Sequence, residues 1–339
     1  FHQSEYVGEH FKARKFITGF SGSAGTAVIT KTEARLWTDG RYFIQAAAQL
    51  KGTTVELMKM GEPGVPEMNA YIEEVLKEGE TLGFDGRVVS VGEGEGYAAI
   101  AGKKNAKVNY QVDLIDEIWE DRPVLSEEPA FNLDVKYAGE TVASKLARIR
   151  EEMKEAGTNV HVVSTLDDIC WTLNIRGNDI DFFPLVLSYG IITMYSFELY
   201  IDEKKLDDKL KAKLEKDGVN LHPYNDIYED VKKFGSDVVA MIDPGKLNYA
   251  LFNNIPENVK TVEKRNPAIL MKAIKNPVEI ENIRKAQIKD SVAHVRFMKW
   301  LKENVGKETI TEMSASDKLD EFRAEMGGFI RPSFGPISA

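Results

Sequence analysis

Arg41 stands in a sequence context suited to binding a carboxylate or a carbonyl group. It belongs to the stretch Thr38-Asp39-Gly40-Arg41-Tyr42-Phe43, which follows a short apolar run and contains an acid, a glycine and two aromatic residues. A guanidinium is planar and donates hydrogen bonds in pairs, which suits it to a carboxylate or a peptide carbonyl. Arg41 is therefore a candidate substrate contact. A turn in which Asp39 binds Arg41 and fixes only local structure explains the same pattern, and both interpretations stay open.

The five histidines are scattered along the chain and form no metal-binding motif. None belongs to H-E-x-x-H, and none lies beside a cysteine at zinc spacing. His161 lies in an apolar run and is interpreted as a core histidine, whereas His294 is expected on a helix surface or at an interdomain contact. His2 opens the polar motif His2-Gln3-Ser4-Glu5-Tyr6, interpreted as a loop, where one histidine and one carboxylate do not make a metal site. No metal ligand is predicted in this chain.

Two glycine-rich stretches fail as phosphate-binding loops. Residues 19–25 precede a strand expected at 27–30, whereas a dinucleotide-binding fingerprint must follow a strand and open a helix. Residues 92–96 carry acidic side chains that would repel phosphate. The serines of the first stretch cannot be placed in a nucleophile elbow, and Cys170 lies in an apolar run as a buried small hydrophobe. No catalytic constellation is found.

A second charged segment, residues 174–181 (NIRGNDID), follows Trp171 and Leu173. Its charges could line a cleft between domains or merely decorate a loop. The loop is the favoured interpretation.

The composition excludes several classes of protein. The 339 residues carry 44 basic and 54 acidic side chains, a net charge of −10, which argues against a surface that grips nucleic acid. No apolar run approaches the roughly 18 residues of a membrane helix. The single cysteine allows no internal disulfide, which suits the cytoplasm. No charged-then-apolar leader follows Phe1, so no signal peptide is expected, although a chain that begins with Phe need not be complete.

The hydrophobic pattern divides the chain into blocks. In the first block, residues 1–122, a hairpin is expected at 27–30 and 34–38, strands at 53–58 and 107–112, and a helix at 65–77. Residues 123–129 form a linker with two prolines. In the second block, residues 130–271, helices are expected at 141–156 and 203–217 and strands at 160–163, 185–193, 195–201 and 238–242. Alternating strands and helices indicate an α/β fold.

The third block, residues 272–339, is predicted to be mostly helical. Asn276 can cap a helix with Pro277 in its first turn, and this helix is expected to run to Val305. A second helix is expected at 312–326. The side chains expected to be buried along the first helix are Ile280, Ile283, Ile288, Val292 and Val295. Two helices and a tail do not close a core, so the block is interpreted as the beginning of a domain.

The first two blocks share a pattern of motifs. Gly19 is followed by an apolar hairpin that ends at Asp39, and Gly177 is followed by one that ends at Asp202. Further on, Asp85-Gly86-Arg87 is echoed at 243–246. Two related tandem domains would explain this pattern, and chance matching of short motifs is the alternative.

Six segments of the chain resemble, in order, the Xaa-Pro aminopeptidase family. They are residues 2–6 (HQSEY), 16–26 (FITGFSGSAGT), 36–49 (LWTDGRYFIQAAAQ), 57–61 (LMKMG), 166–178 (LDDICWTLNIRGN) and 275–286 (KNPVEIENIRKA). Each motif alone is weak, but six in register are highly specific. The chain is similar to the long, three-domain cytosolic form, aminopeptidase P, of the creatinase/prolidase superfamily.

The resemblance implies two tandem creatinase-like α/β domains, 1–122 and 130–271, followed by the first helices of a pita-bread catalytic domain at 272–339. It implies hydrolysis of the bond between an N-terminal residue and a following proline, with two divalent metal ions, usually manganese, that activate water. The family holds these ions with two Asp, one His and two Glu. Peptides with proline at the second position are the expected partners, nucleic acid and membrane are not, and a homodimer is an expected state.

The sequence departs from the family at both ends. The family's metal ligands lie beyond a Ser-Phe-x-x-Ile-Ser motif, which this chain carries at 333–338 before it ends at Ala339. The family also has a helix and a strand ahead of the motif at 2–6. We therefore expect a fragment that holds no metal ion and is inactive alone. In the family the loop that matches Arg41 faces the catalytic cleft, which favours Arg41 as a substrate contact. The alternative function is a creatinase-like binding or interaction module without catalysis.

Overall fold

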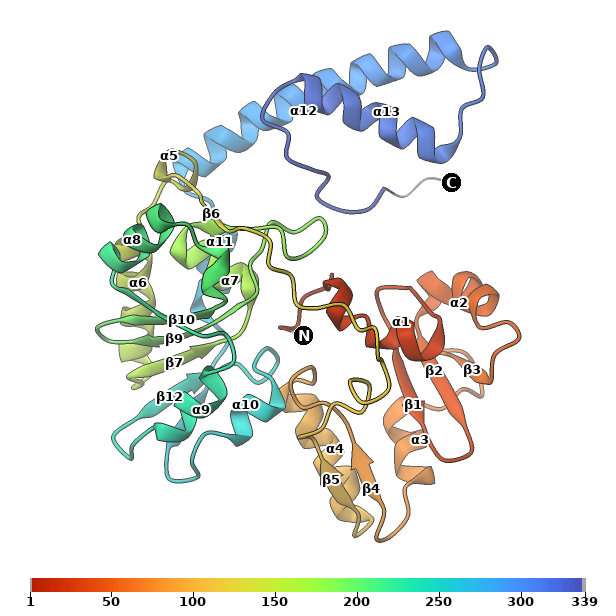
Figure 1. Cartoon of the computed structure of the whole chain (residues 1–339), viewed down its shortest axis with the longest axis vertical. Helices are drawn as coiled ribbons and strands as arrows, with labels where there is room; N and C mark the ends of the chain where they lie inside the picture. Colours follow the sequence, from red (N-terminus) through yellow and green to blue (C-terminus); the bar gives the residue numbers. More distant parts are fainter. Residues whose placement is uncertain (1, 337–339) are drawn as a thin grey trace.

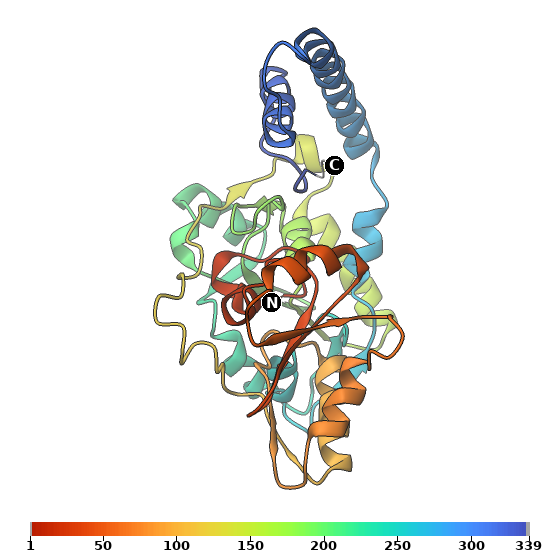
Figure 2. The same ribbon diagram turned by 90° about the vertical axis from the view of Figure 1, so that its right-hand side faces the viewer.

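The computed structural model describes residues 2–336 and contains two α/β units and a helical arm (Figure 1). We call residues 13–109 the first unit, residues 131–273 the second unit and residues 277–325 the helical arm. The arm projects away from both units in two perpendicular views (Figures 1 and 2). The α/β organisation predicted from the sequence is confirmed.

The first unit contains two separate small sheets. One has the order β1-β2-β3, with β1 antiparallel to β2 and β2 parallel to β3, and the other is the parallel pair β4-β5. The strands are β1 (Thr26–Ile29), β2 (Ala34–Thr38), β3 (Val55–Lys59), β4 (Thr81–Gly83) and β5 (Lys107–Asn109). The helices are α1 (Ala13–Thr18), α2 (Phe43–Gln49), α3 (Met68–Val75) and α4 (Val91–Lys103), with 3-10 turns η1 (Glu9–Phe11) ahead of the unit and η2 (Gly40–Tyr42) within it.

The second unit contains a six-stranded sheet in the order β11-β10-β9-β7-β12-β13, in which β9 is antiparallel to both neighbours. The strands are β7 (Val160–Val163), β9 (Ser188–Thr193), β10 (Phe197–Ile201), β11 (Val219–His222), β12 (Val239–Ile242) and β13 (Lys260–Glu263), with a separate pair β6 (Phe131–Asn132) and β8 (Ile175–Arg176). The helices are α5 (Val135–Ala138), α6 (Val142–Glu155), α7 (Leu166–Leu173), α8 (Asp208–Lys216), α9 (Ile227–Asp230), α10 (Tyr249–Asn253) and α11 (Pro267–Ala273), with 3-10 turns η3 (Glu203–Lys205) and η4 (Val231–Lys233).

Five strands of the first unit correspond to five of the six strands in the large sheet of the second unit. Strands β1-β2-β3 have the order and directions of β9-β10-β11, and the parallel pair β4-β5 corresponds to β12-β13. This correspondence supports the duplication predicted from the sequence.

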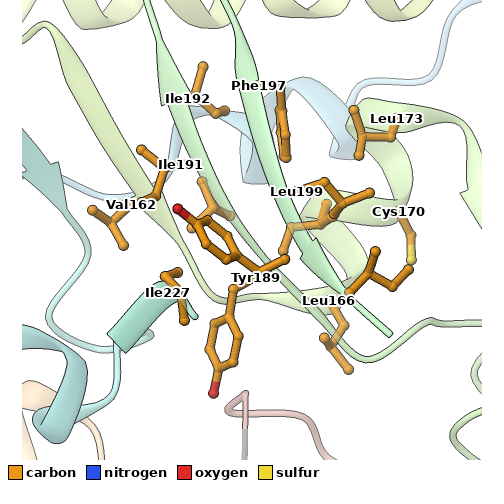
Figure 3. Close-up of a cluster of buried hydrophobic side chains, with 14 of the residues drawn as sticks. Val162, Leu166, Cys170, Leu173, Tyr189, Ile191, Ile192, Phe197, Leu199 and Ile227 are labelled. Atoms are coloured by element: carbon orange, nitrogen blue, oxygen red, sulfur yellow. The ribbon is translucent and has the colours of Figure 1, made fainter. Parts of the chain in front are cut away.

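The main hydrophobic core lies in the second unit. Side chains of β9 and β10 meet those of α7, and Cys170 lies among them as predicted (Figure 3). The face of α6 predicted to be apolar is buried as well, because its side chains follow a helical spacing of 4, 3 and 4 residues. These are Val142, Leu146, Ile149 and Met153, each at most 2% exposed.

The helix predicted at 203–217 is wrong as a single element. It is divided into η3 and α8, because Asp202 and Asp207 each accept a backbone N–H from the residues that follow and so begin a new turn. Between them Lys205 turns inward and is only 3% exposed. The glycine-rich residues 92–96 lie in helix α4. This helix begins with a capping box formed by Ser90 and Glu93.

A reciprocal backbone contact joins the two units. The Val91 N–H donates to the Leu247 carbonyl at 2.9 Å, and the Tyr249 N–H donates to the Val89 carbonyl at 2.9 Å. The residues between these pairs, Ser90 and Asn248, form an isolated antiparallel bridge and are the N-caps of α4 and α10. Equivalent helix starts therefore hold the units together.

The helical arm consists of α12 (Pro277–Asn304) and α13 (Glu312–Glu325), close to the two predicted helices. The predicted burial along α12 is wrong, since its five predicted core side chains are 39–70% exposed and only Ala293 is buried. Among the described residues α12 packs mainly on α13 and on α5, so the rest of its circumference stays uncovered. In residues 2–336 no helix is long and apolar enough to cross a membrane.

Candidate functional site

Arg41 lies in η2, immediately after the carboxyl end of β2. Asp39 Oδ1 accepts hydrogen bonds from the Arg41 backbone N–H at 3.1 Å and from Nε at 2.9 Å, and Oδ2 accepts one from Nη2 at 2.8 Å. These bonds hold the pKa of Asp39 below its usual range and raise the pKa of Arg41, to which nearby Glu5 also contributes. The Arg41 side chain is 66% exposed. The structure therefore contains the local turn, and the Arg41 side chain faces solvent.

A hydroxyl- and amide-rich surface lies beside this turn. The Tyr42 hydroxyl is 2.6 Å from Ser23 Oγ. The Ser21 backbone N–H donates to Gln49 Oε1 at 3.0 Å, and Ser21 Oγ accepts from Gln49 Nε2 at 2.8 Å and from Gln45 Nε2 at 3.1 Å. This network fixes the glycine-rich loop 19–25 against η2 and α2.

The glycine-rich loop needs its glycines for close packing. Gly25 has φ +151°, and a Cβ there would lie 2.8 Å from the carbonyl oxygen of Trp37. The Arg14 guanidinium binds the carbonyls of Gly22 and Gly25, the latter at 2.6 Å. These bonds hold the loop in place, and through the contact of Ser23 with Tyr42 the loop supports the Arg41 turn.

The same Asp-Gly-Arg turn occurs a second time, after β4. Asp85 Oδ1 accepts from the Arg87 backbone N–H at 2.9 Å and from Nε at 3.0 Å, and Oδ2 accepts from Nη2 at 3.0 Å. Unlike Arg41, Arg87 has a second carboxylate, Asp113, at 3.4 Å. The turn geometry alone therefore does not mark a substrate contact, and Arg87 offers a matched comparison for Arg41.

The motif at 2–6 attaches the chain to the second unit. His2 is 3% exposed, its Nδ1–H donates to the Ser164 carbonyl at 2.7 Å, and its Nε2 accepts from the Tyr224 hydroxyl at 2.6 Å. Its ring centroid is 4.3 Å from that of Tyr189. Burial lowers the pKa of His2 to about 3, so the ring is neutral. Residues 2–6 lie outside helices and strands, as predicted for a loop, and His2 is a buried anchor within it.

The favoured interpretation of residues 174–181 is also wrong for two of its polar residues. Asn174 is 1% exposed and Asp179 is 5% exposed. Asp179 Oδ2 accepts from Lys205 Nζ at 2.5 Å and from the Leu187 backbone N–H at 2.6 Å. The partner lysine lies in a charged stretch that resembles an exposed helix, so no sequence pattern indicates this buried pair.

The remaining predicted positions lie as expected. His161 is 1% exposed and bonds to the Met241 carbonyl and to Asn266, which confirms a core histidine. His294 is exposed on α12. Burial raises the pKa of the Cys170 thiol to about 11, so the thiol is held in its unreactive form. Among residues 2–336, no three His, Cys, Asp or Glu side chains are grouped so as to hold a metal ion.

Comparison with known families matches most of the chain. Two families described as Creatinase/Prolidase N-terminal domain match residues 10–118 and residues 121–279. These ranges contain the first unit and the second unit respectively.

Known proteins match over the entire length of the chain. Aminopeptidase P2 of Arabidopsis thaliana is 36% identical over 99% of this chain and 52% of its own length, and Xaa-Pro aminopeptidase 1 of Dictyostelium discoideum is 37% identical over 100% and 56%. The crystal structure of X-prolyl aminopeptidase from Caenorhabditis elegans, described as a cytosolic enzyme with a di-nuclear active site, matches with a TM-score of 0.94 and 34% identity over 100% of this chain and 56% of that one. The chain thus spans about half the length of the relatives it matches.

Proposed function

We propose, on the premise that this chain belongs to the Xaa-Pro aminopeptidase P family, that it forms the N-terminal portion of a metal-dependent aminopeptidase. The proposed reaction releases an N-terminal residue from peptides whose second residue is proline. The match of the whole chain to the Caenorhabditis elegans enzyme at a TM-score of 0.94 is the observation that carries this proposal. The proposed domains are 1–122, 130–271 and 272–339, with a linker at 123–129.

The described residues do not fit the metal site that such an enzyme requires, because they contain no suitable group of ligands. We propose that two divalent ions, with manganese as the expected metal, are held by residues other than 2–336. The di-nuclear site of the Caenorhabditis elegans enzyme supports the number of ions. When bound, such a pair of ions supplies an activated water and polarises the scissile carbonyl.

This chain is proposed to frame and orient the peptide. Arg41 is the proposed contact, since within the described residues its Nη1 has no hydrogen-bond partner while Nε and Nη2 are held by Asp39. The pair fixes the plane of the guanidinium, so its outer N–H groups can donate to a peptide carbonyl or carboxylate without further ordering. We also place the protein in the cytosol, a proposal supported by its lone buried cysteine and by the description of the Caenorhabditis elegans enzyme.

The proposed reaction is tested with the tripeptide Ala-Pro-Ala and with Ala-Ala-Ala as control. The polypeptide from the complete gene, supplied with Mn²⁺, is expected to release alanine from Ala-Pro-Ala only, and a chelator should abolish the release. The 339-residue chain alone should release none. Binding without cleavage by the complete polypeptide would support the interaction module instead, and cleavage by the 339-residue chain would contradict our placement of the metal ligands.

The proposed role of Arg41 is tested by comparison with Arg87, which lies in the same kind of turn. In the complete enzyme R41A should raise KM for Ala-Pro-Ala about tenfold, the effect of losing one charge-assisted hydrogen bond. R87A removes an arginine from the same kind of turn and should leave KM unchanged while lowering the free energy of unfolding. A wild-type KM for R41A would show that Arg41 is only a turn residue.

A further inference from the structure

The helical arm is attached to the second unit through a very small area. Helix α12 follows α11 after a short connection, and its only buried side chain, Ala293, lies in its middle. The start of α12 lies beside the short helix α5 (Figure 1), and α12 and α5 are in direct contact. Because broad packing is absent at this end, the direction in which α12 leaves the second unit depends on a few polar contacts.

Two asparagine side chains make polar contacts with α5. Asn282 Nδ2 donates to the carbonyls of Lys136 at 3.1 Å and Tyr137 at 3.4 Å. Asn276 both contacts α5 and caps α12. Its Oδ1 accepts the backbone N–H groups of Val278 and Glu279, both at 3.0 Å, which caps α12. Its Nδ2 donates to the carbonyl of Ala138, the last residue of α5, at 2.8 Å. The Glu279 carboxylate completes a capping box by accepting the Asn276 N–H at 2.9 Å. One amide therefore caps α12 and also contributes one of the three hydrogen bonds to α5.

Gly139 makes room for this amide. It ends α5 with φ +70°, a conformation that favours glycine. A Cβ at this position would lie 2.1 Å from Asn276 Oδ1 and 2.7 Å from its Cγ and Nδ2. Any side chain at 139 would therefore displace Asn276 as well as strain the backbone.

A buried hydrogen-bond network fixes the end of α5, which Asn276 contacts. Asn174 Nδ2 donates to the Glu140 carbonyl at 2.9 Å, next to Gly139, and the Leu133 N–H donates to the Asn174 carbonyl at 2.7 Å. The Lys145 ammonium, 1% exposed, donates to Asn174 Oδ1 and to the Trp171 carbonyl, both at 2.7 Å. The contact of Asn276 with α5 is thus continuous with the core of the second unit.

We propose that Asn276 is a positioning residue whose Nδ2–H bond to Ala138 is required, together with the Asn282 bonds to Lys136 and Tyr137, to set the direction of α12 relative to the second unit. The capping bonds start α12, whereas the bond to Ala138 is needed to fix the direction of the helix. In the aminopeptidase proposed above, and only if that function holds, the same bond sets how the remainder of the enzyme sits over the Arg41 turn.

The geometry is tested in the 339-residue chain, without any activity, by measuring the distance distribution between spin labels at K209C on α8 and K299C on α12. N276D keeps the capping oxygen but loses the Nδ2–H donor, and G139A adds the interfering Cβ. Each should replace a single narrow distribution with a broad or shifted one. T311A removes the N-cap of α13, which contacts only its own helix, and should leave the distribution unchanged. Cys170 is buried, so the labels report the introduced sites.

Hydrogen exchange distinguishes the effect of Asn276 on the direction of α12 from its role as the N-cap of that helix. In N276D the amides of Val278 and Glu279 should stay protected, because an aspartate caps as well as an asparagine. A wild-type distance distribution in both N276D and G139A would overturn the proposal, and so would loss of protection at these two amides in N276D. If G139A does not fold, N276D alone decides.

Discussion

The first and second units share one strand order but differ at one position in it. In the second unit β7 lies between β9 and β12, pairs antiparallel with the former and parallel with the latter, and joins both halves into one sheet. In the first unit β1 pairs only with β2 and β4 only with β5 among residues 2–336. The two halves of the first unit are therefore not joined by backbone hydrogen bonds.

A cavity of about 930 Å³ lies between these halves, lined by β1, α3 and β4 and by side chains that include Val28, Tyr71, Leu82 and Tyr97. The second unit has one continuous hydrophobic core, whereas the first unit is divided into three small clusters. In the second unit the central strand β7 joins both halves around a single core. Among residues 2–336 the first unit contains no counterpart of β7, and the family is expected to carry a helix and a strand ahead of the motif at 2–6. Within these residues the first unit presents the Arg41 turn and is joined to the second unit by the reciprocal Ser90–Asn248 bridge.

Removal of a buried charge should have the largest effect, and only in the second unit. The Lys205 and Asp179 side chains are 2% and 0% exposed, so K205M leaves a buried carboxylate without its cation and should lower the free energy of unfolding by about 3–5 kcal/mol. Urea unfolding measures the change. In the first unit, K103A breaks the exposed pair with Glu73 and should cost less than about 1 kcal/mol. The double variant D179L/K205M should recover most of the loss, and equal costs for the two single variants would contradict the comparison.

Matched leucine truncations compare the two cores directly. Leu199 is fully buried in the second unit, so L199A should cost about 2–5 kcal/mol. Leu82 borders the cavity of the first unit, where less packing is lost, and L82A should cost less than half as much. Similar losses in urea unfolding would show that the first unit is packed as well as the second.

Acid should weaken the attachment of the N-terminal segment to the second unit. The pKa of His2 is about 3 when folded, against 6.5 ordinarily, so protons bind the unfolded chain more tightly. The stabilisation by neutral His2 is fully present above pH 6.5 and is lost as the pH falls from 6.5 towards 3. H2Q should therefore make the unfolding free energy decline less steeply over this pH window. Part of the decline should remain, because burial also lowers the pKa of His161. H294Q, at an exposed site, is the control, and an unchanged slope for H2Q would refute this role.

The smallest effects should come from the two equivalent N-caps. S90A removes the cap of α4 and should cost about 1 kcal/mol. N248A removes the cap of α10 and also a 3.1 Å hydrogen bond to the Tyr228 hydroxyl, so it should cost more. Thermal unfolding gives both values, and a cost for S90A equal to or larger than that for N248A would contradict this expectation.

Local patterns were predictable where one principle dominated. The apolar spacing of α6, the cap and proline that open α12 and the hairpin of β1 and β2 all lie near their predicted positions. Failures occurred where distant residues decide the outcome. Lys205 is buried because Asp179 accepts a hydrogen bond from its ammonium group, and α4 tolerates Gly94 because the ring of Tyr249 packs where a Cβ would be. Neither partner is close in sequence.

The candidate site was predictable only in part. The sequence identified Arg41 and the competing turn with Asp39, and the structure contains that turn, while the role of Arg41 toward a substrate stays a prediction. The sequence could not distinguish Arg41 from Arg87, because both belong to Asp-Gly-Arg. Only the structure shows that Arg87 also faces Asp113 while Arg41 faces outward.

Native-state hydrogen exchange of the 339-residue chain tests the central claim, that the joined sheet of the second unit is more stable than the two separate sheets of the first unit. Amides of β7, β9 and β12 should exchange only by global unfolding, with one common free energy, whereas amides of β1 and β4 should exchange by local opening at a clearly lower free energy. Urea should lower the opening free energy of the amides in β7, β9 and β12 steeply, and that of the amides in β1 and β4 only slightly. Equal protection and equal urea dependence in β1, β4 and β9 would contradict the account.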